Sequence, residues 1–208
     1  MDFWRPNYRS EALVDGKYSV QVYMRILEEC WNQYKKNSKL EFKDIDYFCY
    51  HIPFTKMAEK AHVKLCRSSN IDVTNEEKAK AVCESLKYSR LMGNCYTASI
   101  YVGLTSLLDN TKKDLANSRI GFFSYGSGCV GEFFSGVVED GYQKYLYNNN
   151  HEEMLKNRSP LDYQQYEDIF NYSVPIDGGN YTFPQYKTKF FRLSGINKHK
   201  RIYESVNK

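Results

Sequence analysis

The chain has 208 residues, 42% of them hydrophobic and 26% charged, which is enough apolar material for the core of a globular protein. The net charge of +4 at pH 7 comes from interspersed charges of both signs, so we expect no nucleic-acid partner. No apolar run reaches the roughly 18–20 residues that span a bilayer, and no signal-peptide pattern opens the sequence, so we expect a cytoplasmic protein without a membrane segment.

The first part of the chain alternates helical and strand patterns. Apolar residues recur at helical spacing over 19–37, with Ser19 as a candidate N-cap. A strand is predicted over 42–50, where it ends in an apolar run, and a helix is predicted over 54–67. Pro53 breaks the strand and suits the first position of that helix.

Two further helices are predicted next. Helical spacing covers 75–91, with Thr74 or Asn75 as the N-cap, and resumes over 96–108 after a break at Gly93. Three small residues on the second of these helices would let another element approach closely: Ala98, Ser99 and Gly103.

A hairpin follows the helices. Strands are predicted over 119–125 and 130–139, joined by the glycine turn 126–128. Beyond about residue 145 the chain is polar and rich in tyrosine, with one helix predicted near 161–171. This order of elements predicts an α/β layered architecture.

The cysteines and histidines show no metal-ligand spacing. The six cysteines lie far apart and include no CxxC pair: Cys30, Cys49, Cys66, Cys83, Cys95 and Cys129. We interpret them as reduced, mostly buried small hydrophobic residues, and expect neither a disulfide framework nor a metal site.

Three polar residues stand where predicted elements meet. His51 follows the strand, Asn94 follows a glycine before a helix, and Ser127 lies between two glycines. An imidazole and a side-chain amide can both donate to a developing oxyanion, and a serine in a glycine turn can approach a carbonyl closely. Each also has a structural interpretation, as a hydrogen-bonded core histidine, a helix cap and a turn residue respectively.

Two lysines, Lys56 and Lys60, lie four residues apart on one face of the helix that follows His51. Ammonium groups beside a helix start suit an acyl or phosphate-bearing substrate. The alternative is a solvated lysine face, which is the usual meaning of this spacing.

Five blocks of the sequence carry a resemblance to a known family. They read DFWRP at 2–6, VDGK at 14–17, HIPFTKM at 51–57, GNCYT at 93–97 and SYGSG at 124–128. With these blocks in this order, the chain resembles the C-terminal half of the 3-hydroxy-3-methylglutaryl-CoA synthases, members of the thiolase superfamily. The resemblance implies the fold class: α/β, the C-terminal half of a thiolase-like layered fold, in which helices pack on a mixed sheet.

The resemblance also implies an acyltransferase activity without a cofactor. Enzymes of this family condense acetyl-CoA with acetoacetyl-CoA to 3-hydroxy-3-methylglutaryl-CoA, in the mevalonate route to isoprenoids. By resemblance His51 would polarise the acetoacetyl group and protonate its oxygen, while Asn94 would hydrogen-bond the thioester region. Residues of the glycine turn and of the lysine helix would bind the substrates: Tyr125, Gly126, Ser127, Lys56 and Lys60.

One departure from the family pattern concerns the nucleophile. The family's catalytic cysteine and glutamate base precede the DFWRP block, and neither has a counterpart here. Cys129, next to the glycine turn, has no activating neighbour in sequence. We therefore expect a fragment or one half of a split enzyme, inactive alone, whose partner is the missing N-terminal half or a second subunit, and a homodimer in the complete protein.

Two alternatives to the leading function stay open. One is a synthase of polyketide β-branching that takes acyl groups from carrier proteins, and the other is a non-catalytic acyl-CoA-binding or assembly module. We expect residues 1–145 to form a catalytic half-domain with the His, Asn and Ser site, and residues 146–208 to extend the same domain.

Overall fold

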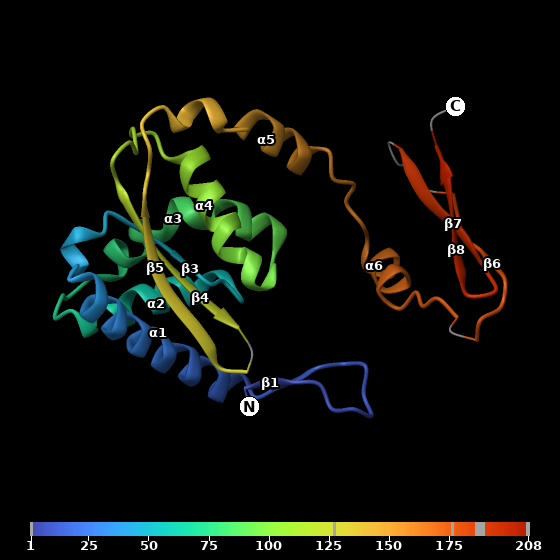
Figure 1. The fold of residues 1–208 in the computed structure, drawn as a ribbon, viewed down its shortest axis with the longest axis horizontal. Coiled ribbons are helices and arrows are strands. Elements are labelled where there is room, and N and C mark those ends of the chain that lie inside the picture. The colour runs from blue at the N-terminus through green and yellow to red at the C-terminus, as the bar shows by residue number, and fades with distance from the viewer. Residues whose placement is uncertain (1, 127, 176, 186–189, 207–208) are drawn as a thin grey trace. The chain divides into compact units, whose positions relative to one another are not determined.

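The computed structural model describes residues 2–126, 128–175, 177–185 and 190–206 (Figure 1). The chain divides into two compact units, Met1–Asn157 and Arg158–Lys208. Each unit is described by itself. Within the described residues, no helix is both long enough and apolar enough to cross a membrane.

The first unit is built on a three-stranded sheet in the order β3-β4-β5. β3 (Tyr47–Tyr50) pairs in parallel with β4 (Arg119–Gly126), and β4 pairs in antiparallel fashion with β5 (Val130–Val137). The sheet is therefore mixed, and the predicted hairpin is confirmed. Two short strands, β1 (Phe3–Trp4) and β2 (Leu13–Val14), form a separate antiparallel pair.

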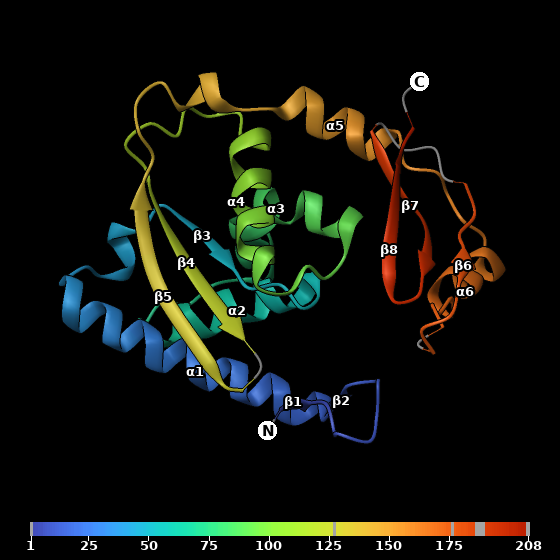
Figure 2. The ribbon, with the colours of Figure 1, turned by 45° about the vertical axis from the view of Figure 1, so that its right-hand side comes forward.

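Four helices cover this sheet. They are α1 (Gly16–Ser38), α2 (Thr55–Ser68), α3 (Asn75–Met92) and α4 (Ser99–Asn110). Figures 1 and 2 show α1 and α4 on opposite sides of the strands. All four helices are predicted by the spacing of apolar residues, and the α/β class is confirmed.

Alternation along the strands explains the two layers. Phe48 and Tyr50 of β3, with Phe123 of β4, belong to the core that α1 and α2 complete. The intervening residues Cys49 and Phe122 belong to a second, smaller core with α4. The sheet is thus apolar on both faces, as expected for strands that helices cover on both sides.

The helix starts are only partly as predicted. The side chain of Asp15 accepts a hydrogen bond from the Tyr18 N–H at 3.1 Å, so α1 begins before Ser19 and the prediction of Ser19 as N-cap is wrong. Thr74 is confirmed as the N-cap of α3, where it forms a reciprocal capping box with Glu77.

Three predicted boundaries need correction. The first part of the predicted strand 42–50 is a 3-10 turn, η1 (Phe42–Asp44), because Glu41 and Asp44 cap each other through side chain and backbone. Pro53 precedes the N-cap of α2, which is Phe54, and so is not the first helical residue. The predicted helix 96–108 starts as a 3-10 turn, η2 (Tyr96–Ala98), before α4 begins.

The prediction of a close approach at α4 is confirmed for Gly103. A Cβ at this position would lie 3.6 Å from the Ser85 backbone oxygen of α3 and 3.8 Å from the Cys49 Cβ of β3. All six cysteines are free, but only Cys49 and Cys66 are buried, so the prediction that most of them are buried is wrong.

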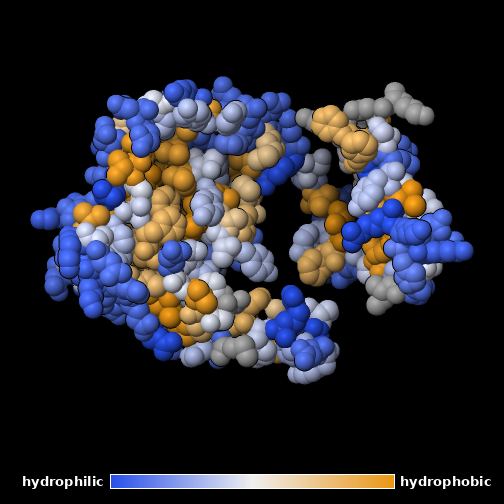
Figure 3. All heavy atoms as spheres, viewed as in Figure 1, coloured by the Kyte–Doolittle hydropathy of each residue, from blue (hydrophilic) through white to orange (hydrophobic). Residues whose placement is uncertain are grey.

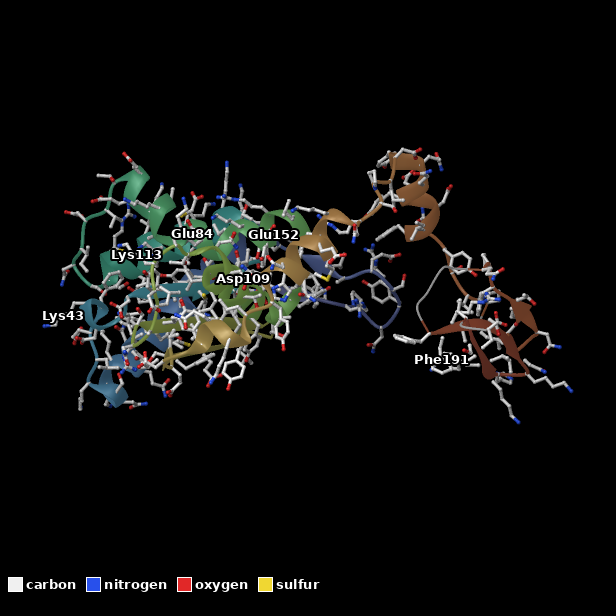
Figure 4. All side chains as sticks on the ribbon, turned by 90° about the horizontal axis from the view of Figure 1, so that it is seen from above. Lys43, Glu84, Asp109, Lys113, Glu152 and Phe191 are labelled. Carbon is white, nitrogen blue, oxygen red and sulfur yellow. The ribbon has the colours of Figure 1, made fainter. Side chains whose placement is uncertain are left out.

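A segment that the sequence did not predict closes the first unit. The 3-10 turn η3 (Tyr142–Tyr145) leads into α5 (Asn148–Lys156). The carboxylate of Asp109, labelled in Figure 4, ties α5 to the helical layer, since it accepts from the Tyr88 hydroxyl at 2.8 Å and lies 2.7 Å from His151 Nδ1.

The second unit contains the predicted helix and a small sheet. α6 (Tyr163–Phe170) falls within the predicted 161–171. β6 (Tyr181–Thr182), β7 (Phe191–Asn197) and β8 (Lys200–Ser205) form an antiparallel sheet in that order. These strands carry charged and aromatic residues with little apolar alternation, and the sequence pattern did not reveal them.

The packing of α1 on β5 leads to a stability prediction. A Cβ on Gly131 would overlap Ile26 Cγ2 and lie 3.2 Å from Cys30 Sγ, whereas a Cβ on Gly136 would meet nothing within 4 Å. We expect Gly131→Ala to lower the free energy of unfolding by about 1–3 kcal/mol through overpacking. Urea denaturation measures the change.

Gly136→Ala is the matched control, because it lies on the same strand and removes the same backbone freedom from the unfolded chain. We expect it to leave the free energy of unfolding unchanged or slightly higher. Equal effects of the two substitutions would contradict the described contact between α1 and β5.

Candidate active site

A cavity of about 300 Å³ lies where β3 and β4 end. Five separate segments of the first unit line it, through Asp2, Phe3, Ser19, Tyr23, His51, Pro53, Met57, Asn94, Tyr96, Thr97, Tyr125 and Gly126. Four of the residues predicted to form a site are thus brought together: His51, Asn94, Tyr125 and Gly126.

His51 is held on both its backbone and its ring. Its N–H donates to the Phe123 carbonyl at 2.7 Å, and its own carbonyl accepts from the Tyr23 hydroxyl at 2.8 Å. Ring atom Nδ1 lies 3.1 Å from Ser99 Oγ. The ring centroid lies 6.0 Å from that of Tyr125, and the residue is only 8% exposed.

Burial decides the charge of His51. Removal from water lowers its pKa from 6.5 to about 4, because the imidazolium loses its hydration. The ring is therefore neutral at pH 7 and can donate one hydrogen bond while accepting another. His62 has its pKa lowered to about 4 for the same reason, but it binds the Tyr50 hydroxyl at 3.0 Å and does not line the cavity.

A buried carboxylate anchors the N-terminal segment beside the histidine. The Tyr125 hydroxyl donates to Asp2, which is 1% exposed, and the Cys129 thiol donates to the other Asp2 oxygen at 3.9 Å. Burial, and then the hydrogen bond to Asp2, raise the pKa of Tyr125 far above its usual range. Tyr125 and, through burial, Tyr23 therefore stay protonated around His51.

Asn94 is exposed at the mouth of the cavity. Its Oδ1 accepts from the Tyr96 N–H at 2.7 Å, so the side chain stabilises the η2 turn and does not cap α4. Within the described part of the chain, Nδ2 has no hydrogen-bond partner. The donor end of the amide thus remains for a ligand. Gly126 ends β4 at the same cavity, and Ser127 lies outside the described residues.

Lys56 and Lys60 lie along a different hollow. This hollow, of about 560 Å³, is bounded by α1, α2 and the start of α3, and both lysines are exposed in it. Met57 of the same helix lines the His51 cavity, so the first turn of α2 borders both spaces. The hollow is also lined by Glu59 and by three further cations, Lys64, Arg67 and Lys78, of which Lys64 pairs with Glu28 at 2.6 Å.

Sequence reasoning did not assign a role to three residues around His51. Tyr23 falls on the apolar stripe of the predicted helix, Ser99 counts only as a small residue, and Asp2 belongs to a motif without a stated task. Their partners lie 28, 48 and 123 residues away along the chain. No local pattern reports such contacts.

The fold and the site together define a class. A mixed sheet with helices on both faces carries a neutral histidine at the end of β3 and a side-chain amide at the mouth of the same cavity, which is an α/β site suited to carbonyl chemistry.

Comparison with known proteins gives the family. The model of the hydroxymethylglutaryl-coenzyme A synthase C terminal matches residues 1–84 and 64–175, and the chain belongs to this family. The hydroxymethylglutaryl-CoA synthase of Enterococcus faecalis is 38% identical over 205 residues, which cover 98% of this chain and 52% of that protein.

Solved structures agree with this assignment. A crystal structure of an HMG-CoA synthase complexed with CoA has a TM-score of 0.85 at 38% identity, over 99% of this chain and 53% of that one. The HMG synthase of the curacin biosynthetic pathway, in complex with holo donor-ACP, has a TM-score of 0.85 at 27% identity, over 99% of this chain and 54% of that one. The chain thus spans about half the length of the relatives it matches.

The buried histidines predict a pH dependence of stability. Between pH 6.5 and about 4 the unfolded chain binds protons at His51 and His62 that the folded chain does not bind. The free energy of unfolding should therefore fall as the pH is lowered through this window. Urea denaturation at several values between pH 7 and about 5, above the range in which most carboxylates titrate, measures the slope.

The variant His51→Gln isolates the contribution of the ring in the candidate site. Because two histidines share the same direction and size of pKa change, we expect the slope to fall by about half. An unchanged slope in this variant would mean that His51 is not a buried neutral histidine.

Proposed function

We propose that the complete protein is a hydroxymethylglutaryl-CoA synthase, which condenses acetyl-CoA with acetoacetyl-CoA to 3-hydroxy-3-methylglutaryl-CoA and free CoA in the mevalonate route. The observation that carries this proposal is the neutral, buried His51 beside the donor amide of Asn94 in one cavity. The family membership and the CoA complex of a relative at 38% identity support it.

In this proposal His51 and Asn94 act on the acetoacetyl group. When a carbanion attacks the ketone carbon, negative charge develops on the ketone oxygen, and a hydrogen bond from the imidazole stabilises it. The resulting tertiary alkoxide then takes the N–H proton of the neutral imidazole, and the imidazolate that is left regains a proton from water. Asn94 donates to the thioester oxygen without changing its charge, and Tyr125, Gly126 and Ser127 shape the acyl end of the site.

The nucleophile and the base of the reaction come from outside this chain in our proposal. Burial raises the pKa of the Cys49 thiol to about 12 and that of the Cys66 thiol to about 11, so neither is a thiolate at neutral pH. The thiol of Cys129 donates to the Asp2 carboxylate at 3.9 Å.

The lysine hollow suits the CoA moiety. Lys56 and Lys60 lie within it as exposed ammonium groups, and three further cations border it. Phosphate and pyrophosphate groups are natural partners for such a cluster of point charges. Because the first turn of α2 borders both this hollow and the His51 cavity, a CoA thioester can place its nucleotide on one side and its acyl group on the other.

An apolar face of the first unit is the proposed site of the partner half. Figure 3 shows hydrophobic residues gathered over β5 and α4. The core beneath this face contains partly buried residues, among them Leu104, Leu108 and Phe134, and Val137 is 46% exposed. We propose that a segment corresponding to the other half of the relatives packs here, and that the complete protein is a homodimer.

A second candidate function keeps the chemistry and changes the donor. The curacin-pathway relative was crystallised with a donor acyl carrier protein, which favours carrier-bound acyl groups in that enzyme. The cationic hollow beside α2 favours free CoA here. Comparing turnover of the complete protein with CoA-bound and carrier-bound donors separates the two candidates.

The proposal predicts the effect of His51→Gln in the complete protein. Condensation should fall by a factor of about 10²–10⁴, the usual contribution of a proton-transfer group, while acetylation of the protein by acetyl-CoA alone persists. Release of CoA from acetyl-CoA with acetoacetyl-CoA, and mass spectrometry of the acetylated protein, measure the two steps.

His62→Gln is the control for this experiment, since His62 is equally neutral and buried but lies outside the cavity. It should change stability more than turnover. If His51→Gln retains wild-type condensation, or if the wild-type protein releases no CoA from this pair of substrates, the proposed function is wrong.

Lys56→Ala tests the CoA side of the site. Loss of one exposed cation should raise the KM for CoA thioesters about two- to tenfold and leave kcat nearly unchanged. Lys43→Ala is the matched control, because Lys43 is also exposed, lines neither cavity and lies at the outer edge of the unit in Figure 4. A collapse of kcat in Lys56→Ala would place this lysine in the chemical step instead.

A further inference from the structure

Ser99 stands between the end of β3 and the start of α4. It is the first residue of α4 and only 2% exposed. Its hydroxyl contacts two groups of the segment that follows β3: the Ile52 N–H at 2.9 Å and His51 Nδ1 at 3.1 Å. One serine therefore joins the backbone and the imidazole of the candidate site.

The numbers of donor hydrogens and acceptor lone pairs assign a direction to each of these hydrogen bonds. A serine hydroxyl has one hydrogen and two acceptor lone pairs, whereas a backbone N–H can only donate. Ser99 Oγ must therefore accept from Ile52, and it still has its hydrogen to donate. Among the described residues, the hydrogen-bond partner of Ser99 Oγ that can accept this hydrogen is His51 Nδ1.

The opposite direction leaves a buried donor unsatisfied. If Nδ1–H donated to Oγ, the Ser99 hydroxyl hydrogen would have no acceptor among the described residues, although Ser99 is only 2% exposed. Buried hydroxyl groups without a partner are costly. The arrangement with Ser99 donating to Nδ1 satisfies all three groups.

The location of one proton then decides what His51 can do. At neutral pH the ring carries a single N–H, because burial keeps it uncharged. With Nδ1 occupied as an acceptor, the proton must reside on Nε2. The backbone hydrogen bonds with Phe123 and Tyr23 fix the position of the His51 backbone at the end of β3.

We infer that Ser99 is a positioning residue that selects the Nε2–H tautomer of His51, so that the ring presents a donor and not an acceptor to the substrate oxygen. The tautomer itself follows from the contacts described. Its use in catalysis rests on the proposed function. Without Ser99 the two neutral tautomers would interconvert, and a fraction of the molecules would turn a lone pair toward a developing negative charge.

Nitrogen-15 NMR of the chain labelled in histidine tests the tautomer directly at pH 7. The chemical shifts and long-range proton couplings distinguish a protonated ring nitrogen from an acceptor nitrogen. The signals that vanish in His51→Gln belong to His51. We expect Nε2 to be protonated in the wild type, and a mixed pattern in Ser99→Ala.

Ser106→Ala is the matched control. Ser106 lies two turns further along α4, is fully buried, and likewise donates to one group and accepts from another, here the Glu84 carbonyl and the Tyr88 N–H. Its loss should disturb the packing of α3 on α4 without changing the His51 signals. Equal changes in both variants would indicate a general packing effect and overturn the inference, as would a wild-type ring protonated on Nδ1.

Activity of the complete protein tests the catalytic consequence. Ser99→Ala should lower kcat about ten- to a hundredfold, the usual effect of removing a group that orients an active-site side chain, with little change in KM. Wild-type kcat together with a mixed tautomer would show that the tautomer does not matter for turnover and would overturn the positioning role. Absence of condensation in the wild type would refute the proposed function alone, because the NMR result does not depend on it.

Discussion

The parallel pairing of β3 with β4 is the constraint on which the site depends. Tyr50 faces Phe123 in this register, and the ladder extends one residue further through the bond from the His51 N–H to the Phe123 carbonyl. His51 therefore leaves the sheet beside Tyr125, which lies two residues further along β4. A one-residue shift in the register would turn every side chain of β3 to the other face.

Parallel strands also require a long crossover, and this protein uses the crossover to build the rest of the cavity. The connection from β3 to β4 contains α2, α3, η2 and α4. Its last part returns to the end of β3, which brings Asn94 to the mouth of the cavity and Ser99 onto the His51 ring. The sheet and its crossover thus supply most of the site from one continuous stretch of chain.

Burial gives the cavity and the neighbouring hollow different electrostatic characters. Around His51 burial keeps the rings neutral, since the imidazole lacks its proton and the phenols of Tyr23 and Tyr125 keep theirs, and the Asp2 carboxylate in the same cavity accepts from Tyr125. Across α2 the hollow is lined mostly by cations, of which Lys56, Lys60 and Arg67 are exposed. Low exposure strengthens the hydrogen bonds inside the cavity, and exposed cations attract anions at a lower desolvation cost than buried ones. The first turn of α2 borders both environments.

The sequence by itself determined the features that depend on local spacing. Helical periodicity located α1 to α4 and α6, the glycine turn located the β4–β5 hairpin, and the motif blocks indicated the family and brought His51, Asn94 and Tyr125 forward as candidates. Tertiary structure decided what depends on partners distant in the chain: Asp2 meets Tyr125, and Ser99 meets His51. The reason is physical. Periodicity indicates which face of an element is apolar. The partner of a buried polar atom is determined only when distant segments pack together and exclude water.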